Sequence, residues 1–377
     1  MHRYLIAPDS FKGTMSSSEV CLIIEQAILE AEPDALVEKV AVADGGEGLV
    51  DAYLSMFGGE RIWIDVTGPL FKPVRAFWGL LPDGQTAVIE MAAAAGLPLL
   101  SAAEKNPEQT TTLGVGELVM SAINHGVKKI VLGLGGSATN DGGIGLASAL
   151  GYRFLDAAGR DLLPTGSSLL KISRIVPPAA SPLPAGLEIE AACDVSNPLL
   201  GLQGAAHVFA PQKGADPGMV ERLDQGLANL AVRIAADLAI DVLNVPGGGA
   251  AGGLGAGVVA FLGGRLRPGI ELMLDAADFD RKVQDADFVI TGEGRMDGQT
   301  LSGKAPVGVV RRAKRYQVPV IGIVGSLGGN ADALYEIGFT TIISTIRELA
   351  SLEDTLGSCR QDLAAAVKAV VRLINAR

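Results

Sequence analysis

The stretch Gly133-Leu-Gly-Gly-Ser-Ala-Thr-Asn-Asp-Gly-Gly-Ile-Gly145 lies between two segments of different character. The apolar run 129–132 before it predicts a buried strand, and the run 144–150 after it predicts a helix. Glycines let the backbone approach a ligand closely, and N–H groups at a helix start point toward negative charge. Ser137, Asn140 and Asp141 add hydroxyl, amide and carboxylate groups. The loop is therefore a candidate site for an anion, a substrate hydroxyl or a metal, although a tight helix cap would produce the same glycine pattern.

The composition predicts a large globular protein of two domains. The chain has 377 residues, of which 48% are hydrophobic, and a net charge of −11. Such an acidic protein repels nucleic acid and anionic membrane surfaces, so we expect neither as a partner. The sequence has no run of membrane-spanning length, no signal-peptide layout and only three scattered cysteines, which predicts a cytoplasmic setting. Histidine is also scarce, so proton transfer is expected to fall to carboxylates or lysine.

Both ends of the chain alternate between strand and helix patterns, whereas the middle begins differently. Ser16, with Glu19 three residues later, predicts a helix start after the first strand. The segment 61–91 has the pattern of an antiparallel meander. The segment 247–264 is rich in glycine but apolar throughout, so we expect close packing or backbone contact with a ligand rather than a linker.

These patterns predict an α/β protein of two domains. The first is a doubly wound, Rossmann-like parallel-sheet domain formed by both chain ends, residues 1–66 plus 287–377. The second is an inserted α/β domain with a mixed sheet, residues 67–286. In open parallel sheets, ligands bind at the carboxyl ends of the strands, which is where the glycine loops fall.

Two of these loops lie near the N-terminus. In Asp9-Ser-Phe-Lys-Gly13, Lys12 is a candidate for neutralising a carboxylate or a phosphate. In Asp44-Gly-Gly-Glu-Gly48, Asp44 and Glu47 are candidates for binding substrate hydroxyls or Mg²⁺, a cation that prefers oxygen ligands. A solvated lysine and a helix N-cap are the simpler interpretations of these residues.

Two more loops follow predicted strands later in the chain. Asp194 stands after a strand in an apolar context, where burial would raise its pKa and make it a useful base. Asn197 is held extended by the following proline and can orient a ligand, although an Asx turn at the strand end explains this loop equally well. In the loop 291–305, Arg295 and Lys304 can bind phosphate or carboxylate, but the loop lacks the Ser or Thr of a true P-loop.

Six motifs together resemble the bacterial glycerate kinase type I family. They occur in the family's order over almost the whole chain: Ala7-Pro-Asp-Ser-Phe-Lys-Gly13, Ala43-Asp-Gly-Gly-Glu-Gly48, Gly136-Ser-Ala-Thr-Asn-Asp-Gly-Gly143, Cys193-Asp-Val-Ser-Asn-Pro-Leu199, Gly204-Ala-Ala-His-Val-Phe-Ala-Pro-Gln-Lys-Gly214 and Thr291-Gly-Glu-Gly-Arg295. The resemblance implies an ATP- and Mg²⁺-dependent kinase that phosphorylates D-glycerate, with the 2-hydroxyl as the preferred position. It also implies an active site in the cleft between two α/β domains.

Roles for individual residues follow from the same resemblance. We expect Asp194 to take the proton from the glycerate hydroxyl, with Lys12 as the second catalytic residue. Substrate binding is expected from Ser10, Lys12, Ser137, Asn140, Asp141 and Arg295. The nucleotide is expected near Asn197, Gln212, Lys213 and Gly214. Asp44 and Glu47 are the expected metal ligands, and Asp141 is a further candidate for Mg²⁺ or a substrate hydroxyl.

Other functions stay open at this point. One alternative is a kinase that gives 3-phosphoglycerate or that acts on another small hydroxy acid. A nicotinamide-dependent dehydrogenase would need Gly-x-Gly-x-x-Gly after the first strand, where this chain has Asp9-Ser-Phe-Lys-Gly13 instead. A non-enzymatic small-molecule sensor would need a DNA-binding segment, which the sequence does not offer. The sequence leaves a homodimer open.

Overall fold

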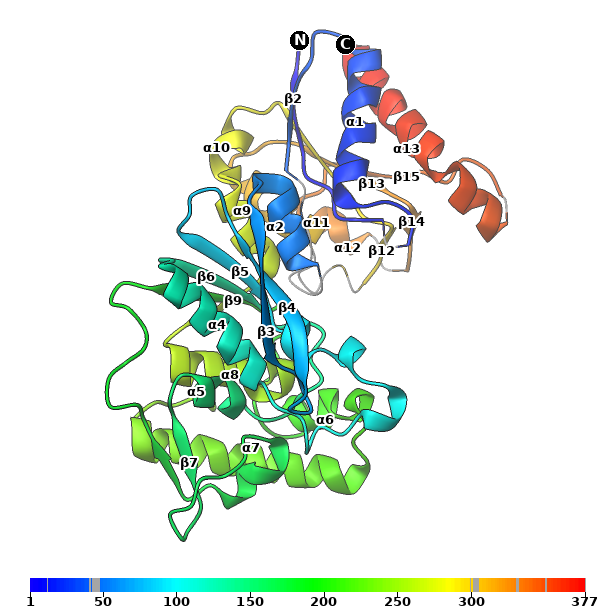
Figure 1. The fold of residues 1–377 in the computed structure, drawn as a ribbon. Coiled ribbons are helices and arrows are strands. Elements are labelled where there is room, and N and C mark those ends of the chain that lie inside the picture. The colour runs from blue at the N-terminus through cyan, green and yellow to red at the C-terminus, as the bar shows by residue number, and fades with distance from the viewer. Residues whose placement is uncertain are drawn as a thin grey trace. The chain divides into compact units, whose positions relative to one another are not determined.

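The chain forms two compact units in the computed structural model, which describes residues 1–11, 13–40, 42, 48–298, 300, 305–329, 332–349 and 351–376. The terminal unit comprises residues 1–44 and 270–377, and the inserted unit comprises residues 45–269. Each unit has its own sheet (Figure 1). The predicted α/β class, with a parallel sheet from both chain ends and a separate mixed sheet, is confirmed.

These units differ in extent from the predicted domains, whose boundaries were placed after residues 66 and 286. Residues 60–67 form a strand that pairs antiparallel with residues 73–80, so they lie in the inserted unit. At the other boundary, residues 270–286 contain helices whose carboxylates bind Arg312 of the terminal unit. Local strand and helix patterns do not reveal such long-range partners, which is why both boundaries shift.

The sheet of the terminal unit is fully parallel, with the order β15-β13-β11-β1-β2. Its strands are β1 (Arg3–Ile6), β2 (Leu36–Lys39), β11 (Phe288–Thr291), β13 (Val320–Val324) and β15 (Thr341–Ser344). The chain leaves β1 toward one edge and continues from β11 toward the other. The topological switch point, where ligands bind in doubly wound sheets, therefore lies at the carboxyl ends of β1 and β11.

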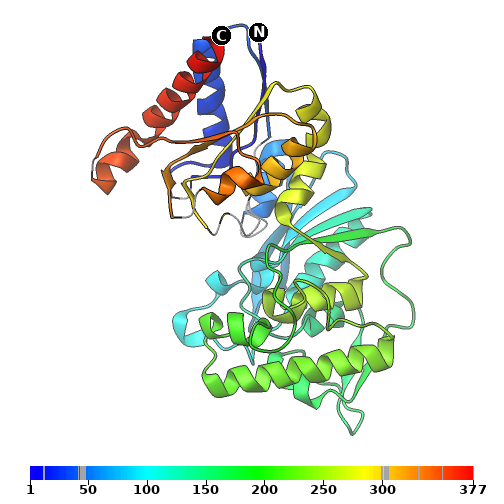
Figure 2. The ribbon, with the colours of Figure 1, turned by 180° about the vertical axis from the view of Figure 1, so that it is seen from behind.

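Two long helices lie side by side against one face of this sheet in both Figure 1 and Figure 2. They are α1 (Ser17–Ala31) and α13 (Leu352–Asn375). The Ser16 side chain accepts a hydrogen bond from the backbone N–H of Glu19, which confirms the predicted helix start. The described part of this unit also contains α9 (Gly269–Ala276), α10 (Phe279–Gln284), α11 (Ala305–Arg315) and α12 (Ala333–Ile337). The short strands β12 (Arg295–Met296) and β14 (Ser326–Leu327) pair beyond the sheet.

Glu32, just after α1, ties the N-terminus to the core of the terminal unit. It accepts hydrogen bonds from the His2 backbone N–H at 2.8 Å and from the Tyr4 hydroxyl at 3.0 Å. Burial opposes ionisation of Glu32, but the hydrogen bonds from His2 and Tyr4 outweigh it and lower its pKa from 4.5 to about 2. A carboxylate with a lowered pKa in the folded state stabilises the fold above its unfolded pKa.

We therefore expect Glu32→Gln to reduce the free energy of unfolding at neutral pH. The difference from the unchanged protein should shrink as the pH falls from 4.5 toward about 2, because the native carboxylate is then protonated. Urea unfolding at several pH values in this range measures this difference in the free energy of unfolding. Glu353→Gln, at an exposed position of α13, is the control. A difference that stays constant with pH would contradict the role of the Glu32 charge.

The inserted unit has a mixed sheet with the order β10-β9-β6-β5-β4-β3. Its strands are β3 (Glu60–Thr67), β4 (Pro73–Leu80), β5 (Thr86–Glu90), β6 (Lys129–Gly133), β9 (Glu188–Ala192) and β10 (Arg265–Arg267). The first three strands form the predicted antiparallel meander, and β5, β6, β9 and β10 are parallel. The loops after β5, β6 and β9 therefore begin along one edge of the sheet.

Helices cover both faces of this sheet. Successive residues of β4 face opposite sides: the Trp78 indole donates to Ser121 of α4 (Leu113–His125), and Gly79 lies against Val50 of α2 (Leu49–Phe57). The α4 side forms a core with α8 (Ala250–Leu262) and α5 (Ile144–Ala149). Beyond it lies a second layer with the long helix α7 (Pro217–Leu238), which Figure 2 shows clearly. The unit also contains α3 (Ala92–Ala95), α6 (Ala205–Phe209), β7 (Arg153–Leu155) and β8 (Arg174–Val176).

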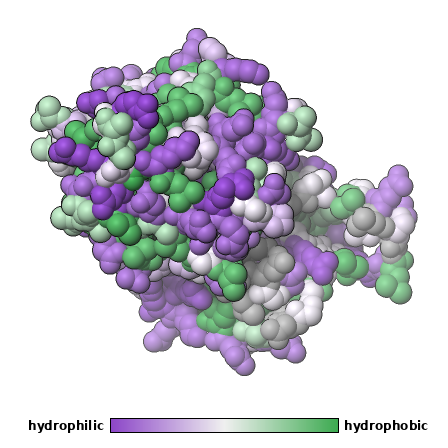
Figure 3. All heavy atoms as spheres, turned by 90° about the horizontal axis from the view of Figure 1, so that it is seen from below, coloured by the Kyte–Doolittle hydropathy of each residue, from purple (hydrophilic) through white to green (hydrophobic). Residues whose placement is uncertain are grey.

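The surface mixes polar and apolar side chains. Figure 3 shows green hydrophobic residues scattered among purple hydrophilic ones on the face that it draws. Single exposed hydrophobic residues of this kind are normal on protein surfaces and do not mark a docking site by themselves. Among the residues that the structure describes, no helix combines the length and the apolar character needed to cross a membrane.

Candidate active site

Two loops of the terminal unit meet at its topological switch point. The Asp9 backbone N–H donates to the Gly292 carbonyl at 2.8 Å, and the Thr291 hydroxyl donates to the Ala7 carbonyl at 2.7 Å. These bonds join the loop after β1 to the loop after β11. The structure thus brings together the starts of the two loops that contain the predicted substrate residues Ser10 and Arg295.

The loop after β11 is braced by further contacts. Arg295 belongs to β12, which pairs with β14, and its exposed guanidinium lies 3.3 Å from the Asp297 carboxylate. Glu293 is buried and accepts a hydrogen bond from the Thr300 hydroxyl at 2.6 Å. An exposed cation on a braced loop is available to an anionic ligand. Lys12 and Lys304, the other cations predicted here, lie outside the described residues.

In the inserted unit, the loops after β6 and β9 start side by side. The Leu134 backbone N–H donates to the Ala192 carbonyl at 3.2 Å. The glycine-rich segment fits between these loops. A Cβ at Gly249 would lie 2.2 Å from the Pro198 carbonyl oxygen, and one at Gly252 would lie 2.1 Å from the Thr139 carbonyl oxygen. The predicted close packing of residues 247–264 is therefore confirmed, and side chains at these positions would push the two loops apart.

Asp141 is completely buried and organises the loop after β6. Its carboxylate accepts hydrogen bonds from the Thr112 backbone N–H and hydroxyl, both at 2.8 Å, and from the backbone N–H groups of Gly143 and Gly145. Thr112 and Gly143 precede α4 and α5, so one carboxylate caps two helix starts. Burial raises the pKa of Asp141, although these hydrogen bonds favour the charged form. The structure gives Asp141 a structural role, and its role as a substrate or Mg²⁺ contact stays a prediction.

Lys213 is also buried and lies beneath the same loop. Its ammonium group donates to the Thr139 carbonyl at 2.7 Å. Burial lowers the pKa of Lys213 to about 7, against the opposing effect of the Asp141 charge. Asn140 is fully buried, and neither its amide oxygen nor its amide nitrogen has a hydrogen-bond partner among the described residues. Asn140, Asp141 and Lys213 therefore form one buried polar cluster, and Asn140 retains the hydrogen-bonding capacity that its predicted role requires.

Asp194 lies in the loop after β9, where it accepts a hydrogen bond from the Gly269 backbone N–H at 2.9 Å. Its side chain is exposed, so the expectation that Asp194 is buried is wrong. The strand ends at Ala192, and the chain then runs along the surface. Asn197 in the same loop donates from its amide to the Gln203 carbonyl at 2.8 Å.

The remaining predicted residues occupy different surroundings. Ser137 is buried and forms a backbone bridge with Gly96 after β5. Gln212 and Gly214 flank the buried Lys213 and are exposed. Asp44 and Glu47 lie outside the described residues. Within the described ranges, no group of three or more His, Cys, Asp or Glu side chains could hold a metal ion.

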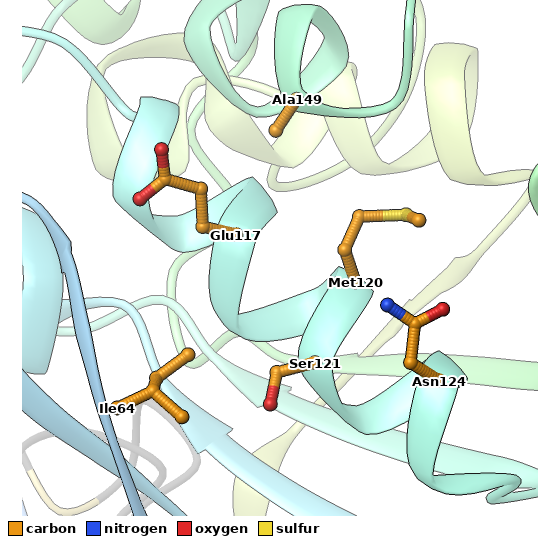
Figure 4. A pocket seen from close by; sticks show the side chains of 6 residues that line it. All are labelled: Ile64, Glu117, Met120, Ser121, Asn124 and Ala149. Carbon is orange, nitrogen blue, oxygen red and sulfur yellow. The ribbon is translucent and has the colours of Figure 1, made fainter.

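A shallow pocket of about 540 Å³ lies away from these loops (Figure 4). Most of its lining comes from one face of α4, and Ile64 and Ala149 complete it. None of the predicted site residues lines this pocket, so it does not contribute to the candidate site.

Sequence reasoning missed two residues that hold the loops in place. Thr112 bonds to Asp141 across 29 positions of sequence, and Glu90 at the end of β5 accepts hydrogen bonds from the start of α2. Thr112 was visible as the last of three threonines before a helix pattern. Glu90 was visible only as an acid at a strand end, which does not identify its partner.

Known proteins resemble this chain over most of its length. The model of the glycerate kinase family matches residues 4–375. The chain belongs to the glycerate kinase family. A glycerate kinase from Bacillus cereus is 47% identical over 93% of this chain and 92% of its own length. A glycerate 2-kinase from Escherichia coli is 44% identical over 93% of this chain and 92% of its own length.

A solved structure shares the fold. It comes from Salmonella typhimurium LT2, is provisionally assigned as glycerate kinase 2, and superposes with a TM-score of 0.89 at 45% identity. The match covers 100% of this chain and 98% of that one. The resemblance inferred from the six motifs is thereby confirmed, and this member of the glycerate kinase family is an enzyme of the phosphotransferase class.

Proposed function

We propose that the chain transfers the terminal phosphoryl group of ATP to the 2-hydroxyl of D-glycerate and releases 2-phospho-D-glycerate and ADP. The observation that carries this proposal is the 44% identity, over 93% of the chain, to the Escherichia coli protein named glycerate 2-kinase. The site agrees with such chemistry, because phosphoryl transfer depends on positioned cations, backbone N–H groups and one carboxylate near the attacking hydroxyl.

In this reaction the hydroxyl oxygen of glycerate forms a bond to the terminal phosphorus, and the bond from that phosphorus to the ADP oxygen breaks. The hydroxyl proton passes to the carboxylate of Asp194. Lys12, Ser10 and Arg295 hold the glycerate carboxylate or the transferring phosphoryl group, and Ser137, Asn140 and Asp141 complete the substrate site. The nucleotide is held near Asn197, Gln212, Lys213 and Gly214. The proposal requires loops of both units to act on the same pair of substrates.

We expect Mg²⁺ to accompany ATP in this reaction, as it does in phosphoryl transfer generally. A nucleotide-bound Mg²⁺ keeps several waters and takes one or two protein carboxylates rather than a complete protein cage. Asp44 and Glu47 supply that kind of oxygen donor. The ion would neutralise charge on the phosphates of ATP.

An assay of ADP release with D-glycerate and Mg-ATP, followed by ³¹P NMR of the product, tests the proposal. We expect turnover with D-glycerate and a phosphorus signal coupled to the proton on carbon 2. L-glycerate is the matched control and should give little turnover. A product with phosphate on the 3-hydroxyl would overturn the assigned position. Absence of turnover with every small hydroxy acid tried would overturn the proposed function itself.

A further inference from the structure

Glu90 links two glycine loops of the inserted unit. Its side chain accepts a hydrogen bond from the Val50 backbone N–H at 2.7 Å and one from the Gly48 backbone N–H at 3.2 Å. Gly48 is the N-cap of α2 and has no side chain with which to cap the helix. Glu90 therefore supplies, from the end of strand β5, the acceptors and the negative charge that the start of α2 requires.

Glu90 also lies beside the start of the loop after β6, which contains predicted site residues. Glu90 is the last residue of β5 and lies opposite Gly133, the last residue of β6. The loop that contains Ser137 starts at Gly133, and the Met91 backbone N–H donates to the Gly133 carbonyl at 3.0 Å. One strand end thus holds both the start of α2 and the root of the loop after β6.

Apolar packing holds α2 against the sheet. Leu49 and Val50 are fully buried, and Val50 lies against Gly79 of β4. These contacts keep the helix on the sheet. The two hydrogen bonds to Glu90 fix the backbone of Gly48 and Val50, and Gly48 is the last residue of the motif Ala43-Asp-Gly-Gly-Glu-Gly48.

We propose that Glu90 is a positioning residue for the reaction: it holds the start of α2, and so the end of this motif, at the carboxyl edge of the six-stranded sheet. Glu90 acts through the backbone of another segment and touches no reacting atom. The inference rests on the proposed function, because the motif contains Asp44 and Glu47, which are predicted to contact Mg²⁺ or substrate hydroxyls.

Glu90→Ala and Glu90→Gln, together with two matched control variants, test the proposal. Glu117 of α4 is half-buried like Glu90 and accepts hydrogen bonds from the backbone N–H and hydroxyl of Thr67, away from the predicted loops. Glu117→Ala and Glu117→Gln therefore remove a similar carboxylate from the same unit. The measurements are the melting temperature, kcat and KM for D-glycerate, and amide exchange at residues 48–50.

We expect Glu90→Ala to lower kcat/KM for D-glycerate by about 100-fold, the size of effect that small misplacements of a reacting group produce. Glu90→Gln should lose less, because its single carbonyl oxygen can still accept from Val50. Amide exchange at residues 48–50 should rise in the same order. Both Glu117 variants should lower the melting temperature as much as their Glu90 counterparts and leave kcat/KM unchanged.

The outcomes separate this inference from the proposed function. If Glu90→Ala does not fold, Glu90→Gln carries the same comparison, because it keeps the length and shape of the side chain. The positioning role would be overturned if the Glu90 variants lose no more kcat/KM, for a given loss of melting temperature, than the Glu117 variants do. Lack of glycerate phosphorylation by the unchanged enzyme would instead overturn the proposed function.

Discussion

Asp194→Asn is expected to lower kcat for glycerate phosphorylation by about 1,000-fold, within the range that general base catalysis contributes. Asparagine has the same shape, and its side-chain oxygen can still accept the hydrogen bond from the Gly269 N–H. The substitution therefore removes the charge and the proton-accepting capacity but keeps the loop contact. KM for ATP should change little, because the proposal gives Asp194 no contact with the nucleotide.

A second aspartate of the inserted unit serves as the control. Asp237 of α7 accepts a hydrogen bond from the Ile175 backbone N–H at 2.7 Å, much as Asp194 accepts one from Gly269. Asp237→Asn should leave kcat unchanged. Melting temperatures of both variants should match the unchanged enzyme. Near-normal turnover in Asp194→Asn would remove Asp194 from the role of base, whereas equal losses in both variants would mean that the effect is structural.

The structure supports this assignment by location rather than by burial. Asp194 follows the carboxyl end of β9, next to the loop after β6 that contains Asn140. We predicted burial from the apolar residues around Asp194, but the strand ends at Ala192 and the side chain that follows is exposed. The sequence shows that the neighbours of Asp194 are apolar, but it does not show whether they cover its side chain in the fold.

Local patterns predicted much of the fold. The alternation of strands and helices that we predicted for both ends of the chain is present, for example in β11 at residues 288–291, because buried parallel strands form short continuous apolar runs. Ser16 begins α1 as predicted, since a capping hydroxyl and its N–H partner lie three residues apart. Such features need only neighbouring residues, and this is why the sequence reveals them.

Features that depend on distant partners escaped prediction. Asp141 caps two helices whose starts are about thirty positions apart, and Glu90 caps a helix that begins some forty positions before it. The same is true of the unit boundaries, which depend on the pairing of β3 with β4 and on the partners of Arg312. The candidate site was therefore predictable as a set of loops, whereas the residues that hold those loops were not.

Arg312→Met is expected to destabilise the terminal unit by about 2–3 kcal/mol, because it leaves three partly exposed carboxylates without their buried cation, a lower cost than for a fully buried pair. The Arg312 side chain is 5% exposed and binds three carboxylates. Its guanidinium lies 2.6 Å from Glu271 and 3.1 Å from Asp280, and it also bonds to Asp275. Methionine fills similar space but leaves three acidic groups close together without a cation.

This destabilisation tests whether α9 and α10 belong to the terminal unit. Arg312 lies on α11, whereas its partners lie on α9 and α10, which the predicted boundaries had assigned to the inserted domain. The destabilisation should therefore appear in the terminal unit. Both tryptophans, Trp63 and Trp78, lie in the inserted unit, so tryptophan fluorescence reports on that unit and far-ultraviolet circular dichroism reports on both.

Urea unfolding followed by both signals makes the comparison. In Arg312→Met, part of the circular dichroism change should shift to lower urea, while the fluorescence transition stays in place. Arg360→Met is the control, since Arg360 pairs with Glu19 in the same unit but is 52% exposed, and exposed pairs contribute at most about 1 kcal/mol. A fluorescence transition that moves together with circular dichroism would mean that the two units unfold as one. A loss no larger than that of Arg360→Met would show that the three carboxylates do not depend on Arg312.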